Sequence, residues 1–114
     1  MAVSNSAIIE TKYVEDVLTT QYTSPAGTVP VQTIVDNFTV SNSSGGSETV
    51  TVHLVPAGDI ADASNVVKTK TLADGRTYNF SEVVGHTLEP GDFIAAISST
   101  ASTLILRASG RLLT

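Results

Sequence analysis

The stretch TVTVHL at residues 49–54 decides the fold class. Apolar and polar side chains alternate strictly along it, so that Val50, Val52 and Leu54 share one face. Such alternation is typical of a β-strand with one buried face and one exposed face. His53 falls on the opposite face, among threonines, and we expect it to point into solvent.

Short runs of the same kind lie on both sides of this stretch. In the run before it, Ile34, Phe38 and Val40 are expected to share a buried face. Segment 41–47 and the Asp74-Gly75 pair are each interpreted as a hairpin connection, because glycine supplies the positive φ that tight turns need. Further strands are expected at residues 5–13, 66–72, 76–80, 93–98 and 103–111.

Turn signals recur about every 8–12 residues between these strands, and no long amphipathic helix competes with them. The fold class predicted is therefore all-β: an antiparallel β-sandwich, jelly-roll or immunoglobulin-like, of about seven to eight strands. Residues 31–114 are expected to form the sandwich domain. Residues 1–30 are expected to form an N-terminal arm or edge region, because Pro25, Gly27 and Pro30 interrupt strand pairing there.

The composition excludes several classes of function. The chain has 114 residues and a net charge of −5, and its six basic residues are scattered along the sequence, so a nucleic-acid partner is not expected. No apolar run is long enough to enter a membrane. The absence of cysteine excludes disulfides and thiolate metal sites, and the N-terminus lacks a signal peptide, so folding in a cytoplasm is expected.

No catalytic, cofactor-binding or metal-binding residue is predicted. His53 and His86 are the only histidines, and both are better interpreted as surface or turn residues than as general bases. The carboxylates concentrate in turns, where aspartate bonds the local backbone, so neither a glycosidase pair nor a calcium site at Asp59 and Asp62 is favoured. The chain is therefore not expected to be an enzyme.

Aromatic residues give little support for a carbohydrate site. The chain has no tryptophan, and Phe38 and Phe93 are expected in the core. Tyr13, Tyr22 and Tyr78 would form a glycan platform only if they gathered at a shared groove. A receptor- or carbohydrate-binding module is kept as an alternative.

Several motifs of the second half resemble those of small bacteriophage virion proteins of β-sandwich type. The resemblance covers about residues 34–114, and it is carried by VTVHLVPAG at 50–58, KTLADGRTY at 70–78, LEPGD at 88–92 and RASG at 107–110. It implies a head decoration subunit or a neck or tail accessory subunit, and it carries over no catalytic residue.

Composition and resemblance together lead to one functional hypothesis. The chain is expected to be a non-enzymatic virion structural protein, a decoration or cement subunit on the exterior of a bacteriophage head. A neck, tail or fibre-base component is the alternative within this class. The expected partners are copies of itself, in a homo-oligomer such as a trimer, and the major capsid protein or other virion subunits. Anchoring is assigned to residues 1–30 and exposed contacts to loops 41–47 and 56–65.

Overall fold

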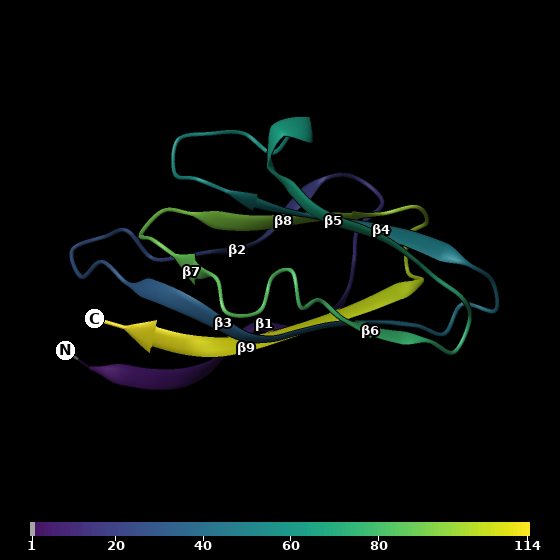
Figure 1. Cartoon of the computed structure of the whole chain (residues 1–114), viewed down its shortest axis with the longest axis horizontal. Coiled ribbons are helices and arrows are strands. Elements are labelled where there is room, and N and C mark those ends of the chain that lie inside the picture. The colour runs from purple at the N-terminus through teal and green to yellow at the C-terminus, as the bar shows by residue number, and fades with distance from the viewer. Residues whose placement is uncertain (1) are drawn as a thin grey trace.

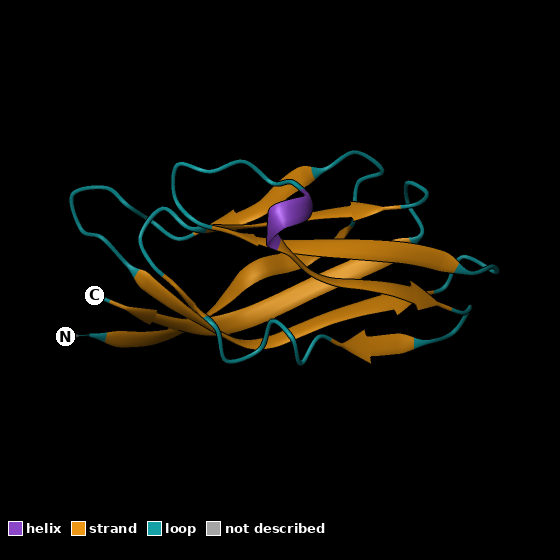
Figure 2. Ribbon diagram, turned by 45° about the horizontal axis from the view of Figure 1, so that its top comes forward, coloured by secondary structure: helices purple, strands orange, loops and turns teal. Residues whose placement is uncertain are grey.

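The computed structural model describes residues 2–114 as two β-sheets packed face to face (Figures 1 and 2). One short 3₁₀ helix, η1 (Ala63–Asn65), accompanies them. The strands are β1 (Val3–Tyr13), β2 (Thr19–Thr23), β3 (Gln32–Asn42), β4 (Glu48–Val55), β5 (Val66–Leu72), β6 (Thr77–Asn79), β7 (Thr87–Leu88), β8 (Phe93–Ser98) and β9 (Leu104–Leu113).

Sheet A has the strand order β1-β9-β3-β6, and the short β7 also pairs with β3. Sheet B has the order β2-β8-β4-β5, and every pairing in both sheets is antiparallel. The predicted antiparallel sandwich is confirmed, and this interleaved order makes it a jelly roll. The strands number nine rather than seven or eight. β2 lies in the region expected to form an arm or edge, and the two-residue β7 lies where no strand is expected.

Two expected hairpins are instead crossings from one sheet to the other. Segment 41–47 joins β3 of sheet A to β4 of sheet B, and the Asp74-Gly75 turn joins β5 of sheet B to β6 of sheet A. Gly75 does adopt the positive φ of 78° that the turn signal required. The two crossings brace each other: Asp74 accepts the backbone N–H of Gly45 at 2.9 Å, and Gly75 N–H donates to the carbonyl of Asn42 at 2.8 Å. The predicted turns therefore occur at both places. Their sequences do not indicate which of the two sheets the chain enters next.

Residues 2–30 supply one edge strand to each sheet. β1 pairs with β9 at the edge of sheet A, and β2 pairs with β8 at the edge of sheet B. The same region also contributes Ile8, Ile9 and Val14 to the hydrophobic core. Residues 2–30 therefore contribute both edge strands and core side chains to the sandwich.

β-Bulges decide which side chains enter the core. In β3 a bulge between Val35 and Asn37 shifts the register against β9. As a result Val35, rather than the expected Ile34, is fully buried on the face of Phe38. Bulges in β1 act similarly, and the adjacent residues Ile8 and Ile9 are both buried.

The core fills the space between the sheets. Phe38 and Phe80 meet edge to face at 5.2 Å, and Tyr78 meets Phe80 edge to face at 4.9 Å, both favourable aromatic geometries. Val50 and Val52 are fully buried, as the alternation of residues 49–54 predicts, whereas Leu54 is only partly buried against the core. Phe93, expected in the core, is only partly buried at the start of β8.

A substitution at Gly110 tests whether β9 and β3 approach each other closely at this position. A methyl group at this position would overlap the backbone carbonyl oxygen of Ile34, which cannot move away without opening the strand pair. We expect Gly110→Ala to lower the free energy of unfolding by about 1–3 kcal/mol, the usual cost of overpacking. Gly46→Ala is the control, because open space surrounds that position, and its effect should stay within about 0.5 kcal/mol. Equal denaturation midpoints for the two variants would contradict this account.

Candidate functional site

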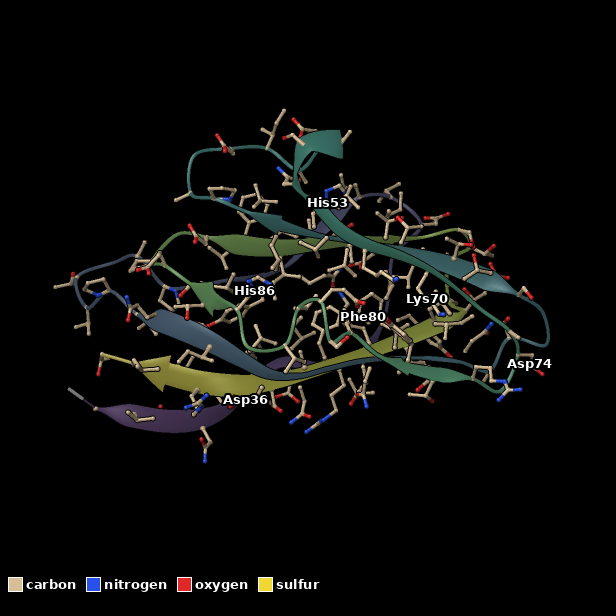
Figure 3. All side chains as sticks on the ribbon, viewed as in Figure 1. Asp36, His53, Lys70, Asp74, Phe80 and His86 are labelled. Carbon is tan, nitrogen blue, oxygen red and sulfur yellow. The ribbon has the colours of Figure 1, made fainter. Side chains whose placement is uncertain are left out.

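His53 is buried beneath the loop that joins β4 to β5 (Figure 3). Its Nδ1 lies 2.9 Å from Oδ1 of Asn65, which also accepts the backbone N–H of Asp62 at 3.0 Å. An amide oxygen only accepts hydrogen bonds, so Nδ1 of His53 is the donor. The side chain does leave the core face as predicted, but the expectation of solvent exposure is wrong, because residues 56–65 fold over it.

The loop at 56–65 is held by an aspartate cap. Asp62 Oδ1 accepts the backbone N–H of Ser64 at 2.8 Å and its hydroxyl at 2.5 Å. These bonds, the one from the hydroxyl first, lower the pKa of Asp62 below its ordinary value. No group of three or more His, Cys, Asp or Glu residues between positions 2 and 114 is arranged to hold a metal ion.

His86 lies exposed in a turn, as expected, beside a small hollow of about 140 Å³. Asp92 lines the same hollow, but its two carboxylate oxygens accept the backbone N–H groups of Ala57 at 2.9 Å and Glu89 at 3.0 Å. The acidic residue of this hollow thus serves turn structure, as the position of Asp92 in the sequence predicts.

Another hollow lies beside the bulges of sheet A. It measures about 460 Å³ and lies open on the sheet, lined by residues of β1, β3 and β9 around Asp36 and Asn37. Asp36 is held there by Arg111, whose guanidinium donates to both carboxylate oxygens at 3.0–3.2 Å. This bond, with the attraction of the carboxylate, raises the pKa of Arg111. The carboxylate at this hollow is therefore already paired with a guanidinium group.

The tyrosines do not gather at a groove. Tyr22 belongs to β2 at one edge of sheet B, and its hydroxyl bonds that of Thr33 at 2.8 Å. Tyr78 belongs to β6 at the edge of sheet A on the other side of the sandwich, and it donates to Glu82 at 3.0 Å. The condition set for a glycan platform is therefore not met by these two residues.

The edge formed by β5, β6 and the turn at 73–76 is the basic edge of the molecule. Lys68 and Lys70 share the strand face of the buried Leu72, so they lean across the open side of the sandwich toward sheet A. The Nζ atom of Lys70 lies 4.9 Å from the centre of the Tyr78 ring, a cation–π contact. With Arg76, this edge holds three of the six basic residues of the chain.

Two groups at the basic edge have altered acidity. The hydrogen bond to Glu82 raises the pKa of Tyr78. A backbone hydrogen bond lowers the pKa of Glu82, against the effect of partial burial, and the bond from Tyr78 lowers it further. Lys68 completes this cluster at 3.9 Å from Glu82. The sequence-based view of scattered basic residues missed the cluster, although the Lys-x-Lys spacing in a strand places both lysines on one face.

The opposite side, formed by β1, β2 and the crossing segment 14–18, is the acidic edge. Lys12 and Glu15 form an ion pair at 2.9 Å, and Gln21 also donates to Glu15 at 3.0 Å. Burial opposes ionisation of Glu15, but these bonds lower its pKa. Asp16 is exposed and pairs with no cation of residues 2–114. Val17 and Leu18, next to it, are 63% and 42% exposed.

Comparison with known proteins gives a likeness of fold alone. No family model and no curated protein matches the sequence. A chain from Bacillus endospore appendages, described as a novel family of disulfide-linked pili, superposes with a TM-score of 0.55 and 12% identity, covering 98% of this chain and 88% of that one. A chain of infectious bursal disease virus, Gt strain, gives a TM-score of 0.37 and 11% identity over 97% of this chain and 30% of its own length. The structure contains no helix between residues 2 and 114 that is long and apolar enough to cross a bilayer.

The pKa of the Asp62 carboxyl tests whether the cap forms. We expect the Asp62 carboxyl to titrate below the ordinary aspartate pKa, and Ser64→Ala to move that pKa upward, because the hydroxyl donor is lost. Since the folded pKa is depressed, the stabilisation by the cap is present above the ordinary pKa and is lost as the pH falls through the folded value. Carboxyl ¹³C NMR measures both values. Asp59 is the internal control, and an unchanged Asp62 titration in the variant would show that the hydroxyl bond is absent.

Proposed function

We propose that this chain is a non-enzymatic structural subunit of a virion, a decoration or cement protein on the exterior of a bacteriophage head. The observation that carries the proposal is a jelly roll whose two sheets end in open edges of opposite charge. His53 is bonded to Asn65 of the loop that covers it, and the carboxylates of Asp62 and Asp92 accept hydrogen bonds that hold loop and turn structure. The sequence resemblance to small virion proteins supports the choice of a virion.

We propose that the anchoring role assigned to residues 1–30 belongs to exposed residues of the acidic edge. Ile8, Ile9 and Val14 are core residues, so deletion of this region would unfold the sandwich and would not test attachment alone. Exposed positions such as Asp16 and Val17 are the appropriate targets for substitution. The glycine-rich crossing at 43–47 offers the exposed contact proposed for loop 41–47, whereas residues 56–65 are partly committed to covering His53.

A filamentous appendage is the second candidate, favoured by the fold likeness to the Bacillus pilus chain. That protein is described as disulfide-linked, whereas this chain has no cysteine. A filament of this chain would therefore be held by non-covalent contacts alone, and reducing agents would leave it intact.

The location of the protein in purified particles tests the proposal. Virions and filaments released by a culture that produces the protein are separated by density, and the chain is quantified by mass spectrometry. A head decoration subunit should co-sediment with virions in copy numbers on the order of hundreds, following the symmetry of the shell. A dozen or fewer copies would favour the neck or tail. Recovery in filaments would favour the appendage, and recovery in neither would contradict a structural role.

A further inference from the structure

We propose that the groove of the basic edge receives residues 16–18 of a second copy of this chain, so that copies associate head to tail. The inference rests on the proposed function, and it names the partner and the surface through which a structural subunit would self-associate. The contact is heterologous: one copy contributes its acidic edge and the next copy its basic edge. Such contacts build rings when the rotation closes and filaments when it does not.

The groove lies between strands β5 and β6, where the two sheets separate. It measures about 330 Å³, and its lining includes Lys70, Leu72, Arg76 and Tyr78. Arg76 is exposed, and neither it nor Lys70 forms an ion pair with any described carboxylate. Among the described residues, the groove thus combines two cations outside any ion pair with aliphatic and aromatic surface, although the charge of Lys70 also acts at longer range on Glu82. It suits a short segment that carries a carboxylate beside apolar side chains.

Residues 16–18 form such a segment. Asp16 is exposed and has no cationic partner among residues 2–114, and the two residues after it are Val17 and Leu18, both exposed. Isolated exposed apolar residues are ordinary, but an adjacent pair beside a free carboxylate matches the lining of the groove in both charge and polarity. The chain is acidic overall, at −5, so copies repel each other except where the basic edge is presented.

The strand register places segment and groove at the same height on opposite sides of the sandwich. In sheet A, Tyr13 pairs with Ile105, Ile105 with Ser41 and Ser41 with Thr77. Tyr13 precedes the crossing segment and Thr77 lines the groove. One row of paired residues therefore runs from the segment to the groove across sheet A.

Sheet B repeats the arrangement. The carbonyl of Glu15 accepts the N–H of Ser98, Ser98 pairs with Val50, and Val50 pairs with Lys70. A copy displaced sideways by one sandwich width, without sliding along the strands, therefore brings its Asp16 toward Lys70 and Arg76 of its neighbour.

Strand direction allows copies of the same orientation to sit side by side. The path of each sheet contains four strands in antiparallel order, so its two edge strands run in opposite directions. A translated copy therefore sets its β1 antiparallel to β6 of its neighbour and its β2 antiparallel to β5. The inward lean of Lys68 and Lys70 shields the basic edge from unspecific strand pairing, which favours side-chain recognition of an acidic segment.

Charge reversal of the full-length chain tests the inference by sedimentation velocity over a range of concentrations. We expect wild type to self-associate, and Asp16→Lys and Arg76→Glu each to raise the dissociation constant by about tenfold or more. Added salt should weaken wild-type association, because the charges are exposed at the surface. Asp59→Lys and Arg107→Glu are the controls, with the same charge changes outside the groove and segment 16–18. Arg107 donates to Thr11 of β1, so circular dichroism verifies folding of this and every other variant.

Mixing the two variants separates a head-to-tail contact from a symmetric one. The Asp16→Lys chain keeps an intact groove and the Arg76→Glu chain an intact segment, so the mixture should form a heterodimer that grows no further. The double variant, which exchanges the two charges, should regain part of the wild-type association.

Three results would overturn the inference: a wild-type monomer at millimolar concentration in low salt, single reversals no weaker than their controls, or a mixture that stays monomeric. If the chain co-sediments with virions but shows any of these, the interface is wrong and the proposed function stands. If the interface is verified but the chain occurs in no particle or filament, the proposed function fails and the interface stands.

Discussion

The pairing of β9 with β3 at Gly110 is the constraint on which sheet A depends. β9 lies between β1 and β3, and the missing side chain at Gly110 lets the backbone of β3 approach closely at Ile34. Both neighbouring strands carry a bulge beside this point, between Ser6 and Ile9 in β1 and between Val35 and Asn37 in β3. Bulges increase local twist and bend a strand. We therefore expect the close contact at β9, with a bulge in the strand on each side of it, to curve the sheet around the core.

This constraint also marks what sequence patterns can predict. Where the strands are regular, period-2 alternation identifies the buried side chains correctly, as with Val50 and Val52 of β4. Each bulge adds one residue and reverses the alternation beyond it. The buried partner of Phe38 is for that reason Val35 rather than Ile34. An extra residue in a strand leaves little trace in a single sequence, because its cause lies in the neighbouring strands.

The two segments that cross between the sheets show that strand order, too, is hard to predict from local sequence. The segment at 41–47 and the Asp74-Gly75 pair carry good turn signals, and turns do occur at both places. Their pairing partners, however, come from strands distant in the sequence: β3 lies beside β9, and β4 lies beside β8. Local chemistry determines that the chain reverses, whereas packing of the whole sandwich determines the sheet in which it continues. The same holds for the basic edge, since Lys70 and Tyr78 come from different sheets.

The two edges of the sandwich differ in how well their unpaired strand backbones are protected against pairing with a foreign strand. On the basic edge, β6 is only three residues long and β5 turns two lysines inward, both of which discourage a foreign strand. On the acidic edge, bulges and the charged residues Glu10 and Lys12 defend the second half of β1, whereas Val3–Ser6 is regular and uncharged. Protection that is dense on one edge and partial on the other is difficult to explain for a solitary monomer, which gains from guarding both. It is natural for a subunit whose less guarded edge meets a partner, as in the proposed head-to-tail association.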